Sequence, residues 1–365
     1  MSKSLTIVKL LHYGFLVLLT SLLLSCSSKQ IQEHGLPPKP EFLMTKQKGG
    51  RFSVMAYNVE NLFDTEKDEN RKDWEYLPLS LKASLNAKAY CDTLKSSYQQ
   101  KECLEKDWNE EILKKKMSQL ADSILQVRDQ GPDILMLEEV ENIKILKRFN
   151  KEYLQKAGYI TEVLIEGDDQ RGIDIGLLSR FPLSGTPKLH KIETLKNTRG
   201  IQEVVLKLPT GQTVTILGLH FPSQGNPHQH RVDAVNTLNK IAASKKSEDL
   251  IIAGGDFNIT TEEDRDSKLF EKTLGEKWYV THQIGCKTCK GTHNYKGSWS
   301  FLDALLFSKN FNPSNQIGVA LLPDTILTPM WGKTQALKTW RPARFRDDGT
   351  GVSDHLPIYA EFEVR

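Results

Sequence analysis

Acidic, amide and histidine side chains recur at the ends of short apolar runs along this chain. The six occurrences are Asn58 with Glu60, Glu138 with Glu139, His220, Asp256 with Asn258, Asp303, and Asp354 with His355. Strand ends give side chains a rigid base and leave backbone groups free, so ligands tend to bind there. Side chains of these types can bind cations or transfer protons. Their recurrence predicts one reactive site assembled from several strand ends.

Each occurrence taken alone has a plainer interpretation. Asp256 and Asn258 flank a phenylalanine, a pattern typical of a turn in which both side chains bond nearby backbone. Glu138 and Glu139 could form a solvated strand end, and a lone histidine such as His220 is more often structural. Six occurrences at strand ends are much harder to explain as turns.

The elements that would position these residues are mostly strands. Apolar or alternating runs predict strands at 52–59, 133–137, 159–165, 173–178, 202–208, 213–219, 250–253, 302–307, 318–322 and 356–364. Helical spacing of apolar residues predicts helices at 112–127, 142–157, 228–243 and 267–274. So many strands with so few helices do not fit a doubly wound parallel sheet. The pattern favours an α/β (α+β) domain in which two mixed sheets pack together with helices outside.

Residues 64–110 interrupt this pattern. They are polar and charged, with Trp74, Tyr76 and Trp108 scattered among them. We predict a partly helical surface insertion within a domain that spans 51–365.

The composition is that of a globular protein with little net charge. The chain has 365 residues, 39% of them hydrophobic, and a formal charge of +3. Loss of the first segment with Lys3 and Lys9 would lower that charge to +1. A near-neutral body argues against holding nucleic acid by bulk electrostatics, although a local basic cleft remains compatible with it.

The first residues have a targeting pattern. Lys3 and Lys9 precede an apolar run at 10–24, which is shorter than the ~20 residues of a spanning helix. Cys26 follows Leu-Leu-Ser, which resembles the bacterial lipoprotein box, so we predict a signal peptide at 1–25 and lipidation of Cys26. An ordinary signal peptide or an uncleaved anchor are the alternatives. We predict that residues 26–50 form a flexible tether. We also expect the protein to be exported and anchored to a membrane, in the periplasm or at the cell surface.

Four cysteines remain after Cys26. They are Cys91, Cys103, Cys286 and Cys289. An even number in an exported protein favours disulfides. The spacing of Cys286 and Cys289 is also that of half a zinc site, but a full site usually needs a second close pair. Both interpretations, and free thiols, stay open.

Six motifs together resemble the endonuclease/exonuclease/phosphatase superfamily, which includes pancreatic deoxyribonuclease, abasic-site endonucleases, bacterial sphingomyelinases and inositol polyphosphate phosphatases. The motifs are 55–63 (MAYNVENLF), 132–140 (PDILMLEEV), 219–223 (LHFPS), 254–258 (GGDFN), 299–303 (WSFLD) and 353–357 (SDHLP). They occur in the family's order. The resemblance implies a four-layer α/β sandwich with one central active site.

The resemblance also implies a set of metal ligands. Glu139 corresponds to the principal ligand of Mg²⁺ or Mn²⁺, with Asn58, Glu60 and Asp354 as neighbours that bind directly or through water. Hard dications prefer such oxygen ligands and keep several waters.

Further roles follow from the same resemblance. Asp256 and Asn258 resemble the pair that positions the attacking water and binds the phosphoryl oxygens, and His355 with Asp303 resembles the family's histidine–carboxylate pair. His220 resembles the second histidine, which contacts the phosphate or protonates the leaving group in the deoxyribonuclease branch. The implied reaction is in-line attack of water on a phosphodiester, with either Asp256 or His355 as the base.

Basic residues near these motifs could contact the substrate. Arg171 and Arg199 each precede a predicted strand, and phosphate contact is one interpretation of both. A structural salt bridge, such as Arg171 with Asp174, is the other. Arg341, Arg344 and Arg346 lie just before Asp354. We favour the interpretation that they form a basic rim over the site. The alternative is a loop in which they pair with Asp347 and Asp348.

Three functions are compatible with these features. The first is an exported metal-dependent phosphodiesterase, a nuclease whose substrate is nucleic acid. The second is a phosphatase or sphingomyelinase-like phosphoesterase on lipid or sugar phosphates, which a membrane anchor would bring within reach. The third is a non-catalytic surface-binding lipoprotein, against which the complete motif set argues. No obligate protein partner is evident from the sequence.

Overall fold

The computed structural model describes residues 50–329 and 341–365. The predicted signal peptide, Cys26 and the tether up to residue 49 lie outside the described residues. Within the described part, no helix has the length and apolarity to cross a bilayer.

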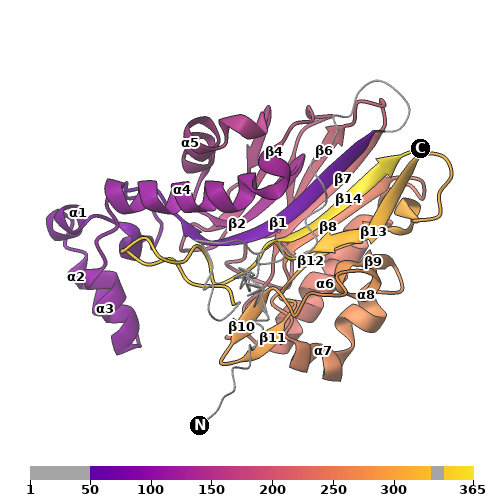
Figure 1. The fold of residues 1–365 in the computed structure, drawn as a ribbon. Coiled ribbons are helices and arrows are strands. Elements are labelled where there is room, and N and C mark those ends of the chain that lie inside the picture. Colours follow the sequence, from indigo (N-terminus) through magenta and orange to yellow (C-terminus); the bar gives the residue numbers. More distant parts are fainter. Residues whose placement is uncertain (1–49, 330–340) are drawn as a thin grey trace, which may run out of the picture. The chain divides into compact units, whose positions relative to one another are not determined.

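Two six-stranded mixed sheets form the centre of the domain (Figure 1). The first has the order β13 (Val319–Leu327), β14 (Ile358–Val364), β1 (Arg51–Leu62), β2 (Ile134–Val140), β4 (Asp174–Ser179) and β3 (Thr161–Leu164). The second has the order β5 (Lys188–His190), β6 (Ile201–Lys207), β7 (Thr213–His220), β8 (Leu250–Asp256), β12 (Asp303–Ser308) and β9 (Trp278–Val280). Pairs β1–β2 and β7–β8 are parallel, and the other pairs in both sheets are antiparallel.

The two sheets pack face to face, and β1 shows how the sequence produces this arrangement. Phe52, Val54 and Ala56 alternate along β1 and join the core cluster between the sheets. The intervening Met55 and Tyr57 join the cluster on the other face of the first sheet. This period of two buries both faces of a central strand, so its sequence is apolar almost throughout.

Helices cover the outer face of each sheet. On the first sheet, α4 (Glu110–Leu125) and α5 (Ile143–Tyr153) pack through a second core cluster, and each begins at an asparagine side chain that caps it, Asn109 and Asn142. On the second sheet, α6 (His228–Ala243) and η4 (Leu269–Leu274) pack through a third cluster. The result is the four-layer sandwich, two mixed sheets with helices outside, which confirms the predicted fold class (Figure 1).

The region 64–110 is partly helical. It contains η1 (Trp74–Tyr76), α1 (Leu79–Ser84), α2 (Lys88–Cys91) and α3 (Ser97–Glu105). A disulfide joins Cys91 to Cys103 and thus α2 to α3. The indole Nε1 of Trp108 donates a 3.1 Å hydrogen bond to the carbonyl of Phe63 and fastens the end of this region beside β1.

Several short elements were not predicted. They are β5, β9, α7 (Thr261–Ser267), α8 (Thr281–Ile284), β10 (His293–Tyr295), β11 (Ser298–Ser300), η2 (Val127–Asp129) and η5 (Lys309–Phe311). The end of the helix predicted at 142–157 is a separate 3-10 turn, η3 (Gln155–Ala157). The predicted helix at 267–274 is divided, because Lys268 has a φ of 58° between α7 and η4. A disulfide joins Cys286 and Cys289, so the disulfide interpretation of this pair is confirmed and the half-zinc-site interpretation is wrong.

Candidate active site

The ends of neighbouring strands bring the predicted residues together. His220 at the end of β7 pairs in register with Asp256 at the end of β8, and Asp303 at the start of β12 pairs with the same Asp256 from the other side. Asn58 on β1 pairs with Glu138 on β2 in the facing sheet. The β1, β8 and β12 strands pack across the sandwich, so both sheets contribute to one site.

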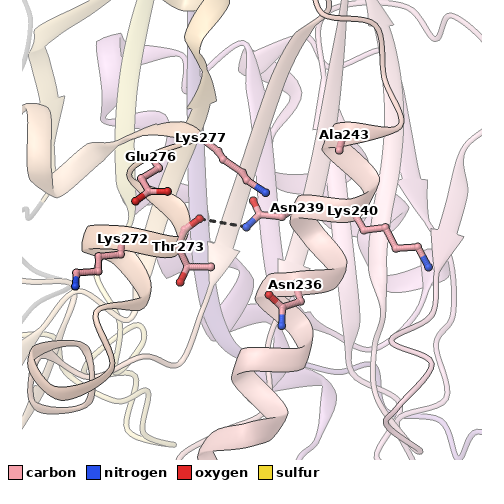
Figure 2. A pocket seen from close by; sticks show the side chains of 8 residues that line it. All are labelled: Asn236, Asn239, Lys240, Ala243, Lys272, Thr273, Glu276 and Lys277. Atoms are coloured by element: carbon pink, nitrogen blue, oxygen red, sulfur yellow. Dashed lines mark hydrogen bonds between the residues drawn. The ribbon is translucent and has the colours of Figure 1, made fainter.

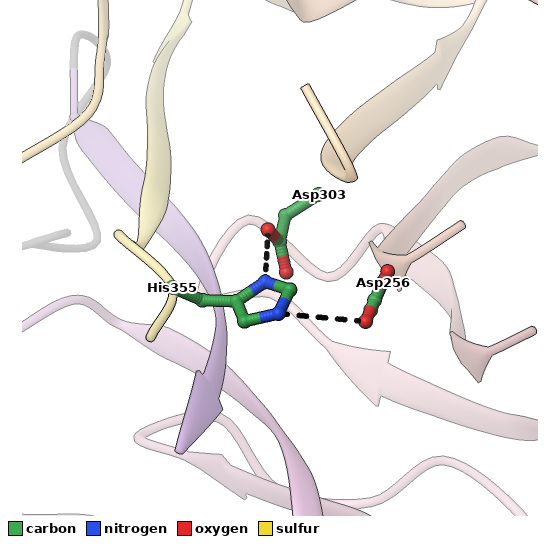
Figure 3. A group of neighbouring side chains, drawn as sticks. All are labelled: Asp256, Asp303 and His355. Atoms are coloured by element: carbon green, nitrogen blue, oxygen red, sulfur yellow. Dashed lines mark hydrogen bonds and ion pairs between the residues drawn. The ribbon is translucent and has the colours of Figure 1, made fainter. Parts of the chain in front are cut away.

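Asp303, His355 and Asp256 form the buried centre of this site (Figure 3). His355 Nδ1 lies 2.7 Å from Asp303 Oδ2, and His355 Nε2 lies 4.0 Å from Asp256 Oδ2. Among the described residues, this is the one group of three acidic or histidine side chains whose ligand atoms all lie within 4.8 Å of one another. The arrangement can hold a proton on the imidazole and direct it toward Asp256.

Charges within the centre change its protonation. Burial lowers the pKa of His355, but Asp303, Asp256 and Asp354 outweigh it, and the pKa lies well above its ordinary value. Burial together with Asp303 raises the pKa of Asp256 to about 7. His355 is therefore positioned as a proton donor, and Asp256 changes charge near neutral pH.

Three neighbours orient the Asp256 carboxylate. Asn258 donates from its backbone N–H to Oδ1 at 2.7 Å, and Asn58 Nδ2 donates to Oδ2 at 3.2 Å. His220 Nε2 lies 3.5 Å from Oδ2. Asn258 has a φ of 53°, a left-handed conformation that non-glycine residues adopt mostly where the surroundings enforce it. The carboxylate is therefore fixed in one orientation by both sheets.

His220 differs from His355 in charge. Burial and the nearby Arg199 and Arg171 hold its pKa well below the ordinary value. It is therefore a neutral imidazole, able to donate one hydrogen bond and accept another.

Glu60 and Asp354 form a second acidic group, held together by Arg344. Arg344 Nε lies 2.7 Å from Glu60 Oε1, and its Nη2 lies 3.1 Å from Asp354 Oδ2. Burial and Asp354 raise the pKa of Glu60 to about 7. Burial raises the pKa of Asp354, but His355 and Arg344 outweigh it and the pKa is lowered. Arg344 thus lies at the rim of the site, as the basic-rim interpretation expects.

Glu139 reaches the same region from β2. Its side chain makes no hydrogen bond or ion pair with the described residues, and its φ is 67°. Its charge helps to raise the pKa of Arg171. The same charge offsets part of the decrease that burial causes in the pKa of Lys116. Among the described residues, Glu60, Glu139 and Asp354 do not form a group in which one carboxylate oxygen from each lies within 4.8 Å of the others. Their carboxylates, with the Asn58 amide, are nevertheless the hard oxygen donors that a dication prefers.

Two buried ionisable residues had no predicted role. Lys116 is completely buried on α4, where its Nζ donates to the carbonyl of Val352 at 2.6 Å, and burial lowers its pKa to about 8. The sequence could have indicated that Lys116 is buried, because its spacing places it on the same helix face as Leu113 and Leu120.

Glu138 is the second of these residues. It is completely buried, and neither carboxyl oxygen has a hydrogen-bond partner within the described structure. Burial, Asp303 and Asp256 raise its pKa well above the ordinary value. A Cβ on Gly255 would lie 2.9 Å from Glu138 Oε1, so glycine there makes room for this carboxyl group. Its place inside the motif at 132–140 gave no indication of its burial.

Arg199 and Arg171 lie on one flank of the site and share Asp169. Arg199 is buried, with Nη2 3.1 Å from Asp169 Oδ2, whereas the Arg171 side chain is half exposed, with Nε 3.9 Å from Asp169 Oδ1. Asp174 accepts a hydrogen bond from the Gly167 N–H at 2.8 Å. Arg171 thus forms a structural ion pair as the alternative interpretation expects, but its partner is Asp169 and not the example given, Asp174.

A separate groove of about 530 Å³ lies between α6 and η4 (Figure 2). Its lining includes Lys240, Lys272, Lys277 and Glu276, and Asn239 crosses it to donate to the Thr273 carbonyl at 3.2 Å. It shares no residue with the Asp256 centre, so we place the candidate chemistry at the strand ends and not in this groove.

Comparison with protein families identifies the chain. The profile of the endonuclease/exonuclease/phosphatase family matches residues 97–364. The protein belongs to this family, whose members generally use a divalent metal. Comparison with curated proteins gives no match.

Solved structures share the fold at low sequence identity. A humanized D. rerio TDP2 carrying 14 mutations is 14% identical, with a TM-score of 0.54 over 86% of this chain and 98% of that chain. D. rerio TDP2 in complex with a single-strand DNA product is 15% identical, with a TM-score of 0.52 over 86% and 98%. A family protein from Bacteroides thetaiotaomicron is 14% identical, with a TM-score of 0.50 over 87% and 100%. These similarities concern the fold alone.

Proposed function

We propose that the protein is a divalent-metal-dependent phosphodiester hydrolase that cleaves nucleic acid outside the cytoplasm. The observation that carries the proposal is the Asp256 carboxylate, held by amides and facing a histidine that is itself bound to Asp303. A pKa of about 7 suits a group that must take up a proton near neutral pH.

The reaction follows from the charges of these residues. Ionised Asp256 accepts a proton from the attacking water. His355, which Asp303 keeps protonated, donates to the phosphoryl oxygens as negative charge develops there. His220 is neutral, and its Nε2, 3.5 Å from Asp256 Oδ2, can supply a further hydrogen bond.

The oxygen donors on the other flank fit a hard dication. Glu60, Glu139, Asp354 and Asn58 would hold Mg²⁺ or Mn²⁺, directly or through water. Such an ion neutralises charge on the phosphoryl group and favours in-line displacement. Burial, and then the neighbouring Asp354 carboxylate, raise the pKa of Glu60, so this pair would gain from a second positive charge beside Arg344.

Nucleic acid is the substrate that the observations favour. Arg171 on one flank and Arg344 at the rim are half exposed or more and can contact phosphates of the substrate, and the buried Arg199 adds positive charge on the first flank. One protein of this fold, D. rerio TDP2, forms a complex with a single-strand DNA product, which supports a strand as substrate. The location rests on the first residues, where Cys26 would carry the lipid of an exported, membrane-anchored protein.

A turnover assay of the full chain in detergent tests this function. Plasmid DNA, single-stranded DNA, RNA, sphingomyelin and a bis-aryl phosphodiester are offered with Mg²⁺ and with chelator. We expect metal-dependent cleavage of nucleic acid, and a loss of roughly 10²-fold or more in Asp256→Asn. Asp266→Asn, an exposed aspartate on α7, is the matched control. Cleavage of sphingomyelin alone would instead support the lipid phosphoesterase.

Metal binding has a test that needs no turnover. Mg²⁺ that binds the folded chain raises its melting temperature by mass action. We expect this rise in the unmodified protein and a smaller one in Glu139→Gln. An equal rise in both would remove Glu139 from the metal site.

A further inference from the structure

Lys116 places a positive charge inside the core of the domain. It is completely buried on α4, on the helix face that also carries Leu113 and Leu120. Lysine is almost never fully buried unless its charge is paired, because the ammonium loses its water there. Within the described part of the chain, however, Lys116 forms no direct ion pair, and its Nζ has one hydrogen-bond acceptor, the carbonyl of Val352 at 2.6 Å. A local ion pair therefore does not explain why this charge is buried.

The segment that accepts this hydrogen bond also carries a predicted metal ligand. Val352 lies two positions before Asp354. Three residues further along α4, the Gln119 side chain donates to the carbonyl of Gly349 in the same segment. The helix therefore holds the segment at two points, and Lys116 holds it immediately before Asp354.

Phe345 connects the same ammonium to a second predicted ligand. Lys116 Nζ lies 5.0 Å from the centre of the Phe345 ring, a distance at which a cation and an aromatic ring attract each other. The backbone N–H of Phe345 donates to Glu60 Oε2 at 3.0 Å. Lys116 and Glu60 thus contact the same residue, which keeps the ammonium close to the acidic group.

The charge of Lys116 acts on the whole acidic group. It lowers the pKa of Glu60 more than Arg344 does, although Arg344 is the direct partner of Glu60. The Arg344 side chain is 62% exposed, whereas Lys116 lies in the core, where water screens a charge little. Burial lowers the pKa of Lys116 to about 8, so the ammonium is still charged at neutral pH. The three carboxylates of the predicted metal site, Glu60, Asp354 and Glu139, offset part of that decrease.

We propose that Lys116 is a positioning residue of the metal site, whose buried ammonium keeps the three carboxylates together until a dication binds. Carboxylates repel one another, and a cation close to them offsets that repulsion. The same charge repels the arriving dication, so metal binding is weaker than the oxygen ligands alone would give. The inference rests on the proposed metal-dependent function and adds to its predicted ligands a residue that does not itself bind the metal.

Calorimetric titration with Mn²⁺ tests this role without turnover. The full chain in detergent, at neutral pH, is compared with Lys116→Met, which removes the charge and nearly keeps the size of the side chain. We expect the variant to bind Mn²⁺ with a Kd lower by roughly 5-fold or more, because a positive charge near the ion is gone. Its melting temperature should accordingly rise more on addition of Mn²⁺ than that of the unmodified protein. Loss of a merely structural side chain would weaken metal binding or leave it unchanged.

Two further variants keep the comparison specific. Lys114→Met makes the same change on the same helix at a side chain that is 57% exposed and 3.7 Å from Glu110 Oε1, so the Kd for Mn²⁺ should stay as in the unmodified protein. Lys116→Gln is a second neutral variant, whose amide can still donate to the Val352 carbonyl, and it should bind Mn²⁺ more tightly as Lys116→Met does. It supplies the comparison if Lys116→Met does not fold.

The outcomes separate the role of Lys116 from the proposed function. Unchanged or weaker Mn²⁺ binding in the neutral Lys116 variants would overturn the role of the charge and leave the metal-dependent function standing. Equally tighter binding in Lys114→Met would make the effect one of net charge and overturn it as well. If neither Lys116 variant folded with or without Mn²⁺, Lys116 would be a residue of the fold alone. No Mn²⁺ binding by the unmodified protein would overturn both proposals.

Discussion

Asp303 holds His355 so that one imidazole nitrogen is occupied and the other faces Asp256. The Nδ1 atom lies 2.7 Å from Asp303 Oδ2, and Nε2 lies 4.0 Å from Asp256 Oδ2. Asp303 is completely buried, so its charge acts on the imidazole with little screening by water. The pair therefore fixes both the orientation and the charge of His355.

Asp303→Asn should reduce turnover by roughly 10²- to 10⁴-fold. Asp303 is the largest of the influences that raise the pKa of His355, so the variant should lose the imidazole proton at lower pH. Turnover rates and ¹⁵N NMR of the imidazole measure the two effects. Asp266→Asn, an exposed aspartate on α7, is the control. An imidazole pKa that does not fall would separate Asp303 from the charge of His355.

Asp256 should titrate near neutral pH in the metal-free protein. Burial and Asp303 raise its pKa to about 7, so the carboxylate form predominates only above that pH. Carboxyl ¹³C NMR should show a titration there that disappears in Asp256→Asn. In Asp303→Asn the same titration should move to lower pH, because a neighbouring negative charge is gone. A titration near the ordinary aspartate value would contradict the burial of this group.

The candidate site around Asp256 could be predicted from the sequence because its residues follow strands that are themselves easy to recognise. Runs such as 250–253 and 213–219 end next to Asp256 and His220, and the register of β7 and β8 then pairs these two residues. The family resemblance supplied His355 and Asp303, which lie far from Asp256 along the chain. Pairings between distant strands have no local signature, so periodicity alone could not supply them.

The β10–β11 hairpin and the contacts of Glu60 and Glu138 could not be predicted in the same way. β10 and β11 have three residues each, too few for an alternation to be detected. Arg344 pairs with Glu60 across 284 positions of sequence, a contact that depends on the packing of the last loop. Burial of Glu138 depends on the absent side chain of Gly255, which is a tertiary effect.

The Cys91–Cys103 disulfide should stabilise the insertion more than the rest of the domain. The bond closes a sequence separation of 12, for which a cost of about 2–4 kcal/mol on removal is typical. A small apolar cluster and a 2.7 Å hydrogen bond from Gln100 Nε2 on α3 to the Leu94 carbonyl also join the two helices. Replacement of both cysteines by serine should therefore increase hydrogen exchange in α2 and α3 and leave β1 protected.

The second disulfide is a matched comparison. Cys286 and Cys289 are separated by 3 positions, so serine replacements there should have a smaller effect. Equal destabilisation by the two pairs of replacements would show that loop length does not determine their contributions.

Glu141 should make the folded state less stable as pH rises. Burial and Asp64 raise its pKa to about 9, and its Oε2 accepts from the Asp64 N–H at 2.7 Å. Between its unfolded pKa and about 9, the folded chain keeps a proton that the unfolded chain has lost. The stability due to this group is fully present below the unfolded pKa and is lost as pH rises through the folded pKa.

Glu141→Gln removes this dependence while it keeps an oxygen that can accept from Asp64. From about pH 5 to about pH 8, the melting temperature of the unmodified protein should fall by at least about 2 °C more than that of the variant. Glu248→Gln, at an exposed position before β8, should follow the unmodified protein at every pH. If Glu141→Gln also followed it, the Glu141 carboxyl group would be ionised in the folded state, and its burial beside Asp64 would require a compensating cation.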